Sequence, residues 1–257
     1  MNRRNPIMMA GLLVMGALVF ALAARAATLT SDLAGWWLFD ETYGITANDS
    51  SGNANNGLIS GAALFTSDVT RGYVLSFAGI SGQANIPYNQ VLEPAAGTVT
   101  VWVKPTLATV GDVVQHGTDS LARCQRTGVW YAYGLRIQKN GAAVAIFAND
   151  NPKTCSRQPQ ILVTGPASSA PLNKWTNLAM RWDGVGTLSL FVNGKKAGST
   201  RYSPTPGTGL SYHGNSPVQV GAGLVGTDLE YSGMVDDLRI YERALSDTEI
   251  RDIYLGQ

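Results

Sequence analysis

GMVDDLRIYERALSDTEIRDIY, residues 233–254, places a strand pattern and a helix pattern one directly after the other. Residues 234–241 mix aliphatic and aromatic residues in a way that is typical of a strand. Ser246 and Glu249 then form a capping box, in which each side chain accepts a hydrogen bond from the other residue's backbone N–H. An apolar stripe at helical spacing follows, made of Ile250, Ile253 and Tyr254. The stretch therefore predicts a last strand that leads into a single short helix.

Upstream of this stretch the chain alternates strand patterns with turns. Residues 98–103 alternate β-branched residues and end before Pro105, which cannot donate to a central ladder. Residues 175–182 place three large side chains on one face: Leu178, Met180 and Trp182. Two shorter strand patterns are bounded by Gly and Pro: Val74–Phe77 and Ala84–Ile86. About a dozen such strands, with turn signals between them, predict an all-β, two-sheet antiparallel sandwich with one short C-terminal helix.

Two Asn-Gly pairs mark hairpins within this pattern. Asn140-Gly141 and Asn193-Gly194 each lie between two strand patterns. A type I′ turn needs positive φ at both central residues, and Asn-Gly adopts that conformation at little cost. We therefore expect a type I′ turn at both pairs.

The N-terminus has the pattern of an export signal. Arg3 and Arg4 are followed by an apolar run from Ile7 to Leu22, and Ala24-Arg25-Ala26 is a small-x-small cleavage site. A membrane anchor is the alternative, but the run is shorter than the ~20 residues that a spanning helix needs. The sequence therefore predicts a signal peptide over residues 1–26, a secreted, periplasmic or cell-surface domain over 27–257, and no membrane insertion after cleavage.

The charge balance restricts the classes of partner. The chain has 19 basic and 18 acidic residues, and cleavage after Ala26 leaves 16 basic against 18 acidic. A domain with a net negative charge is a poor match for nucleic acid or for an anionic membrane. Neither class of partner is therefore expected.

The chain contains two cysteines, Cys124 and Cys155. In an exported chain an even pair is expected to form a disulfide. For a loop of this length the chain-entropy estimate of the stabilisation is ~3.5–4 kcal/mol. Two unpaired, buried thiols are the alternative, although polar loop residues flank both cysteines.

Four blocks of the sequence resemble the laminin-G-like jellyroll family of the concanavalin A-like lectin/glucanase superfamily. The blocks are Gly35–Asp40 with Asp49–Asn53 and Asn56-Gly57, then Thr98–Pro105, then Lys174–Lys195, and finally Gly233–Ser246 with its helix. The resemblance implies a jellyroll of two face-to-face antiparallel sheets, with ligand sites on one rim or on the concave face. It also implies a calcium site in many relatives. It does not fix a function, because this fold carries lectins, glycosidases, lyases, adhesins and spacers.

No recognisable catalytic constellation is present in the sequence. Glycosidases of the superfamily place paired carboxylates on one strand, but none of the five glutamates belongs to a Glu-x-Asp-x-Glu strand. Related lyases use a Gln-x-His strand, whereas Gln115 and His116 are adjacent and should point to opposite faces. We therefore expect a noncatalytic protein, with a polysaccharide hydrolase or lyase that uses an atypical site as an alternative.

Two acidic regions are candidates for a structural Ca²⁺ site. The resemblance implies that the first and last strands are neighbours, which would bring the two regions together, and it favours Asp236 as a ligand. Calcium takes six to eight oxygen ligands from carboxylates, amides and carbonyls. The candidate ligands are Asp40, Asp49, Asn56, Asp236 and Asp237. The alternative is structural: Asp49 belongs to a turn-forming string, and Asp236 caps backbone amides or pairs with Arg239.

The segment from Gly117 to Pro171 carries a mixture of side chains that suits a glycan. Aromatic rings stack on sugars, while Arg, Asn and Asp bind hydroxyl groups. The candidate ligand-binding residues are Arg123, Arg126, Trp130, Tyr131, Asn149 and Asp150. The alternative is that the aromatic residues belong to a buried strand. Three other tryptophans are expected in the core because of their apolar strand neighbours: Trp102, Trp175 and Trp182.

The function that these observations favour is that of a secreted, noncatalytic module. It would bind a carbohydrate or an extracellular protein surface. The second hypothesis is a structural or adhesive cell-envelope protein that binds another protein.

Overall fold

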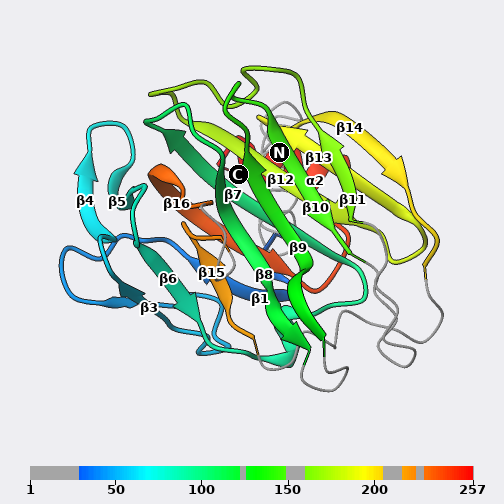
Figure 1. Cartoon of the computed structure of the whole chain (residues 1–257), viewed down its shortest axis with the longest axis horizontal. Coiled ribbons are helices and arrows are strands. Elements are labelled where there is room, and N and C mark those ends of the chain that lie inside the picture. The colour runs from blue at the N-terminus through cyan, green and yellow to red at the C-terminus, as the bar shows by residue number, and fades with distance from the viewer. Residues whose placement is uncertain (1–28, 122–125, 149–159, 205–215, 224–228, 257) are drawn as a thin grey trace, which may run out of the picture.

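The computed structural model of the protein describes residues 29–121, 126–148, 160–204, 216–223 and 229–256 (Figure 1). Within the strands, only the backbone is described for residues 118–121 and 126–131. The described residues form two antiparallel sheets and one short C-terminal helix. The predicted all-β jellyroll sandwich is confirmed.

The first sheet, sheet A, contains the last strand of the chain near its centre. Its order is β14 (Lys195–Arg201), β13 (Thr187–Val192), β12 (Thr176–Trp182), β7 (Gly97–Pro105), β16 (Ser232–Tyr241), β5 (Gly72–Ala78) and β4 (Leu64–Asp68), and β1 (Leu33–Trp37) pairs with β16. The first and last strands are therefore neighbours, as expected.

In the second sheet, sheet B, strands from distant parts of the sequence are also neighbours. Its strands are β11 (Ile161–Thr164), β10 (Ala143–Phe147), β9 (Arg126–Ile137), β8 (Gly111–Leu121), β15 (Val218–Val220), β6 (Gln83–Ile86), β3 (Gly57–Ser60) and β2 (Thr46–Ala47). A short 3₁₀ turn, η1 (Gln90–Leu92), follows β6. The three-residue strand β15 joins β6 to β8 and so completes the sheet.

Alternation along each strand determines which side chains enter the core. Along β7 the three valines at positions 99, 101 and 103 are fully buried, and the residues between them point to the outer face. Trp182 is fully buried and stacks on Tyr133 at 5.1 Å between ring centroids, so its predicted core position is confirmed. The same prediction is wrong for Trp102 and Trp175, which are partly exposed. Trp102 has the opposite parity to the valines of β7, although it lies in the same β-rich run.

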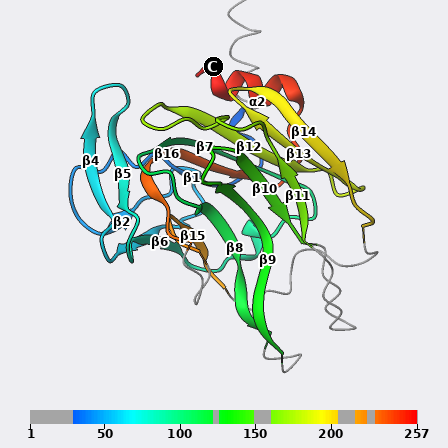
Figure 2. The ribbon, with the colours of Figure 1, turned by 45° about the horizontal axis from the view of Figure 1, so that its top comes forward.

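The helix α2 (Asp247–Tyr254) covers part of the outer face of sheet A (Figure 2). The predicted capping box between Ser246 and Glu249 is present in both directions. Ile250 and Ile253 are buried, in a cluster with residues of β12, β13 and β16: Ala179, Phe191 and Tyr241. The helix therefore closes a second, smaller apolar layer outside the sandwich.

The two Asn-Gly hairpins differ. Asn193 and Gly194 both have positive φ, at 49° and 69°, in the two-residue loop of β13–β14, which confirms the type I′ prediction there. At the β9–β10 turn only Gly141 has positive φ, at 74°. The Asn140 side chain there accepts from the N–H of Ala142 at 3.1 Å, within a longer loop, so the type I′ prediction is wrong at this turn.

Several predicted features lie outside the described residues. These are the signal peptide and both cysteines, Cys124 and Cys155, so export and the disulfide stay predictions. Among the residues that the structure describes, no helix has both the length and the apolar character needed to cross a bilayer.

Candidate ligand-binding site

The predicted ligand-binding residues lie where the side chains are not described. Arg123, Asn149 and Asp150 are outside the described ranges, and for Arg126, Trp130 and Tyr131 only the backbone of β9 is described. Their role in binding stays a prediction. In the neighbouring part of the outer face of sheet B, by contrast, described side chains lie on all eight strands.

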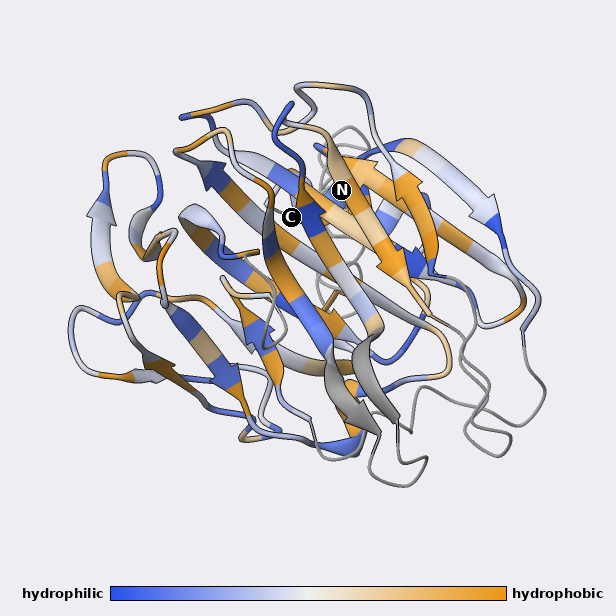
Figure 3. Cartoon of the chain, in the orientation of Figure 1, coloured by the Kyte–Doolittle hydropathy of each residue, from blue (hydrophilic) through white to orange (hydrophobic). Residues whose placement is uncertain are grey.

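One residue from each strand of sheet B forms a row across this outer face. From edge to edge the row is Thr46, Leu58, Asn85, Gln219, Gln115, Gly134, Ile146 and Leu162. The residues on either side of these along each strand, such as Ile59, Ala84 and Val114, belong to the core. Hydrophilic bands on β6, β15 and β8 mark the middle of the row in Figure 3. The row is therefore polar at its centre, with Leu58 on one side of the centre and Ile146 and Leu162 on the other.

Four amide side chains at the centre of this face form one hydrogen-bonded group, which we call the amide patch: Gln83, Asn85, Gln115 and Gln219. The Gln219 Nε2 donates to Gln83 Oε1 at 3.2 Å and to Asn85 Oδ1 at 3.1 Å. The Gln219 Oε1 in turn accepts from the Gln115 Nε2. Gln115 is fully buried, whereas the other three are half-buried. Gln219 is therefore the centre of the patch and sets the orientation of its neighbours.

The amide patch contains one unsatisfied acceptor. The Gln115 Oε1 is buried and has no hydrogen-bond partner among the residues that the structure describes. Leaving a buried polar atom unpaired costs about 1–3 kcal/mol. A bound group that donated a hydrogen bond to this oxygen would recover part of that free energy.

The charged groups described on the same face are paired with each other. Arg136 Nε lies 2.6 Å from Asp112 Oδ1, and Arg136 Nη2 donates to Asp112 Oδ2 at 3.2 Å. Asp112 is almost fully buried. This pair therefore offers a ligand little free charge.

An acid–histidine pair lies on the inner side of sheet B. His116 points into the core while Gln115 points outward, which confirms the expected opposite orientation. His116 Nε2 lies 2.7 Å from Glu93 Oε1, its Nδ1 faces the Pro217 carbonyl at 3.3 Å, and both side chains are 1% exposed. Burial and the charge of Glu93 raise the pKa of the neighbouring Tyr133 well above its ordinary value. These titratable groups are enclosed in the core, and their hydrogen bonds connect β8 to η1 and to the start of β15.

The predicted metal ligand Asp49 is used by its own loop. Its carboxylate accepts from the backbone N–H groups of Trp36, Ser51 and Asn55, each at 2.9 Å, and from the Ser51 hydroxyl. Asn56 Oδ1 accepts from the N–H of Asp49 at 2.8 Å. These bonds match the turn chemistry that was the alternative to a metal site.

The predicted ligands on β16 form ion pairs. Asp236 pairs with Arg71, and Asp237 with Arg239 at 2.8 Å, so the expected partner of Asp236 was wrong. Asp237 has positive φ in a bulge of β16, which lets both neighbouring acids leave the core. Burial raises the pKa of Asp236 to about 6; Arg71 opposes this shift, and the charges of Asp237 and Asp40 add to it.

Three of the five predicted calcium ligands already bond to other groups in this arrangement. Burial and the charges of Glu41 and Asp237 raise the pKa of a fourth, Asp40. Asp49 is occupied by N–H donors, and the two β16 carboxylates are occupied by guanidinium groups. In the part of the chain that the structure describes, no cluster of three or more His, Cys, Asp or Glu side chains has the geometry of a metal site. The calcium site stays a prediction, and no part of the function is derived through it.

The outer face of sheet A carries a network of cations and aromatic rings. The Arg71 guanidinium lies over Trp102 at 4.3 Å and over Trp175 at 5.5 Å, and Trp102 stacks on Tyr254 at 5.6 Å. Burial alone would raise the pKa of Asp68, but hydrogen bonds from Lys104 and Trp175 outweigh it and lower that pKa far below its ordinary value. These rings and charges already contact each other, which leaves little of them for stacking on a ligand.

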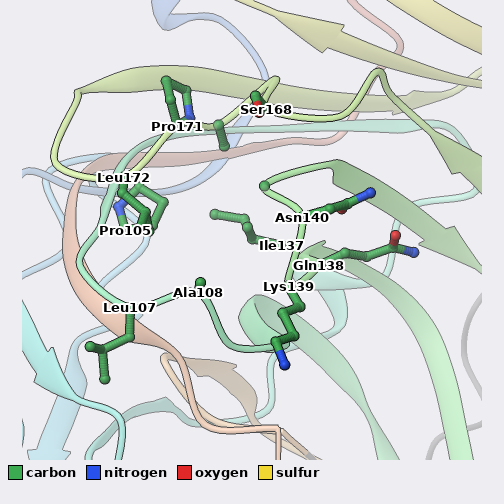
Figure 4. A pocket seen from close by; sticks show the side chains of 12 residues that line it. Pro105, Leu107, Ala108, Ile137, Gln138, Lys139, Asn140, Ser168, Pro171 and Leu172 are labelled. Carbon is green, nitrogen blue, oxygen red and sulfur yellow. The ribbon is translucent and has the colours of Figure 1, made fainter.

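A small pocket lies at one end of the sandwich, between the end of β7 and the β9–β10 turn (Figure 4). Its volume is about 250 Å³, below the ~300–1,000 Å³ of most ligand pockets. Leu107, Ile137 and Leu172 line it together with Asn140, whose side-chain oxygen already bonds its own turn. The pocket is therefore a weaker candidate than the amide patch.

Sequence reasoning did not find the amide patch. The signal was present as alternation: Gln83-Ala-Asn85-Ile86 and Val218-Gln-Val220 each place their amides on one face. Nothing in the sequence, however, shows that β15 lies between β6 and β8. The patch exists only because this pairing brings residues from distant segments together.

Solved structures with the same fold come from different biological settings. The binding domain of Paraclostridial Mosquitocidal Protein 1 has a TM-score of 0.65 at 14% identity, with 89% of this chain and 53% of that chain covered. Domain 4 of AbnA, an extracellular arabinanase from Geobacillus stearothermophilus in complex with arabinotriose, has a TM-score of 0.60 at 20% identity and coverages of 87% and 98%. The binding domain of botulinum neurotoxin DC in complex with rat synaptotagmin II has a TM-score of 0.61 at 13% identity and coverages of 89% and 52%. At these identities the likeness shows the fold alone, and the chain spans about half the length of the toxin binding domains.

Sequence comparison identifies the family. Curated protein sequences give no match to the chain. The sequence profile of the concanavalin A-like lectin/glucanases superfamily, Laminin_G_3, matches residues 78–251, which is more than half of the chain. The match runs from the end of β5 into α2 and so includes most strands of both sheets. The chain therefore belongs to the concanavalin A-like lectin/glucanases superfamily.

Proposed function

We propose that the protein is an exported, noncatalytic module that binds carbohydrate through the outer face of sheet B. The amide patch carries this proposal, because it offers neutral, half-buried hydrogen-bonding groups on the outer face together with one buried acceptor, Gln115 Oε1, that lacks a partner among the described residues. Binding sites for neutral ligands combine apolar surface with a few fixed polar groups. The exposed Leu58 beside the patch supplies apolar surface.

The positions of the acid–base groups support a noncatalytic role. A hydrolase or lyase needs titratable groups within hydrogen-bond reach of its substrate. Glu93 and His116 are enclosed in the core, and Asp112 on the outer face is held by Arg136. The amide patch itself consists of groups that do not titrate and therefore suits binding.

The known complexes of similar folds support both carbohydrate and protein as ligand classes. The AbnA domain was solved with arabinotriose, and the neurotoxin DC domain with synaptotagmin II. A protein ligand is our second candidate because apolar side chains are exposed on or beside β2, β4 and β5: Tyr43, Ile45, Leu64, Val69 and Ile80. Where such side chains form a contiguous patch, they mark a protein interaction surface.

Export through a cleaved signal over residues 1–26 is part of the proposal. It agrees with a disulfide between Cys124 and Cys155, because such bonds persist in oxidising compartments. Intact mass of the exported protein tests both points. We expect a chain that begins after Ala26 and that gains two alkyl groups only after reduction; an uncleaved chain, or two thiols that react without reductant, would contradict the respective point.

A glycan array with the exported protein tests the function. We expect binding to a defined group of glycans, with no release of reducing ends or unsaturated products from the same glycans. Binding to none of the glycans, together with saturable binding to an extracellular protein, would replace carbohydrate by protein as the ligand. Turnover of a bound polysaccharide would instead show an enzyme with an atypical site.

A further inference from the structure

We infer that the amide patch binds a short, uncharged oligosaccharide segment that lies across β3, β6 and β15, and that the amide groups of Gln83 and Asn85 donate to its oxygens. This inference rests on the proposed carbohydrate-binding function and names the ligand class and its position. Three features of the patch carry it: the direction of its hydrogen bonds, the register of its strands and its lack of charge.

The direction of the hydrogen bonds determines which atoms face a ligand. Gln219 donates to the oxygens of Gln83 and Asn85, and its own oxygen accepts from Gln115. An amide has two N–H donors and one oxygen. The NH₂ groups of Gln83 and Asn85 are therefore left to donate to a ligand, whereas the unpaired Gln115 Oε1 is buried. The hydroxyl and ring oxygens of a sugar accept hydrogen bonds, so they match these donors.

The register of the strands sets the length and direction of the ligand. Leu58, Asn85 and Gln219 face one another across β3, β6 and β15. Adjacent strands are 4.7–4.9 Å apart, so these three positions span about 10 Å, the length of two or three linked sugars. Leu58 is 53% exposed at one end of the span. At the other end Gln115 is fully buried, so a ligand that follows the row runs between these two positions.

The lack of charge in the patch favours a neutral glycan. All four of its side chains are amides, and Asp112 and Arg136 on the same face form an ion pair with each other. A uronate carboxylate would lose hydration here without gaining a cation, and charge-assisted bonds are the ones that recover such a loss. We therefore expect neutral oligosaccharides to bind more tightly than uronate oligosaccharides of the same length.

Isothermal titration of the full-length exported protein tests the inference. Neutral and uronate di-, tri- and tetrasaccharides from the array-positive class serve as probes, at low and high salt. We expect affinity for the neutral series to rise up to the trisaccharide, to level off there, and to change little with salt. The double variant Gln83→Ala/Asn85→Ala should lose about fivefold to a hundredfold in affinity, because each of the two lost hydrogen bonds contributes ~0.5–1.5 kcal/mol.

Two controls separate loss of binding from loss of folding. Gln90→Ala removes an exposed amide on η1, outside the patch, and should bind like the wild type. Leu58→Ala should weaken trisaccharide binding and leave the melting temperature nearly unchanged, because this side chain is largely exposed.

Each outcome bears on a different statement. If the double variant binds the glycan with the affinity of the wild type, the ligand binds elsewhere on the protein. That result would overturn only this inference and not the proposed function. Salt-dependent preference for the uronates would overturn the neutral ligand class. If no glycan binds the wild-type protein, the proposed function fails and the inference fails with it.

Discussion

The outer faces of the two sheets both contain buried polar side chains, but these include ion-paired carboxylates on sheet A and are neutral amides at the centre of sheet B. On sheet A, buried carboxylates are held by cations: Asp236 by Arg71, and Asp68 by Lys104. On sheet B the central groups are neutral amides, and one of them, Gln115, keeps an unpaired oxygen. A buried charge without a partner is far more costly than a buried amide with one missing bond.

Buried polar atoms without a described partner occur on both sheets, because Thr100 on β7 and Asn177 on β12 also carry them. The carboxylates of sheet A and the amide patch of sheet B therefore differ in charge rather than in whether every hydrogen bond is made.

The largest loss of stability should follow substitution of a tryptophan in the core between the sheets, and a smaller loss should follow substitution of one on the outer face of sheet A. Trp182→Ala removes a fully buried ring and should destabilise the protein by ~3–5 kcal/mol. Trp102→Ala removes only outer-face contacts with Arg71 and Tyr254, and should cost about 1–2 kcal/mol. Urea denaturation midpoints measure both. Equal losses would mean that Trp102 packs as a core residue and that the assignment of the two faces of β7 is wrong.

The titration of Asp236 on sheet A should change the free energy of unfolding by an intermediate amount. The folded-state pKa of Asp236 is about 6, against 3.8 for the ordinary carboxyl, because burial disfavours its charged form. The folded state therefore binds this proton more tightly, so the contribution of Asp236 to stability is present below pH 4 and is lost as the pH rises through about 6. The loss is roughly 2–3 kcal/mol.

The variant Asp236→Asn isolates this contribution. Unfolding free energies from pH 4 to 8, measured with chelator present, should fall more steeply in the wild type than in the variant. Parallel curves would show that Asp236 does not titrate in this window and that its partners satisfy it fully.

On sheet B, a substitution in the amide patch should leave the free energy of unfolding unchanged or increase it slightly, in contrast to the losses expected above. Gln115→Met keeps the length of the side chain but removes its unpaired oxygen, so stability should stay constant or rise by about 1 kcal/mol. Glycan affinity should fall, because Gln219 loses the donor that orients it. Thermal melts and titrations of the same sample test this. A large destabilisation would show that Gln115 is a structural residue whose oxygen has a partner.

Calcium should have the smallest effect. Arg71 and Arg239 occupy the two β16 carboxylates, and backbone N–H groups occupy Asp49. Binding of an ion would require these contacts to break, so millimolar calcium should shift the melting temperature little. A dissociation constant a hundredfold below the added calcium would instead stabilise the protein by about 2.7 kcal/mol. A rise of that size, reversed by chelator and absent in Asp236→Asn, would establish the predicted calcium site.

The sequence predicts local features of this fold well. The capping box at Ser246, the two-residue turn at Asn193-Gly194 and the opposite orientation of Gln115 and His116 each depend on residues close together in the chain, and each is confirmed. The resemblance to the family added the global fold. Where two faces of one strand both contain large residues, as with Trp102 on β7, composition alone misassigned the buried face.

The candidate site could not be predicted because it depends on pairing between distant strands. Gln219 lies 104 residues from Gln115 and 134 from Asn85. The ion pair between Arg71 and Asp236 spans 165 residues and was missed for the same reason. In both cases the residue types were visible, but the partner could be identified only from the strand order.

The placement of β15 and β16 has a consequence for how the chain acquires its structure. Each of these late strands lies between earlier ones, β15 between β6 and β8, and β16 between β5 and β7. Neither sheet is continuous until residues 218–241 are available, because the earlier strands on the two sides have no direct ladder between them. Such long-range pairing makes folding slow. During synthesis both sheets therefore stay incomplete until residues 218–241 have been made.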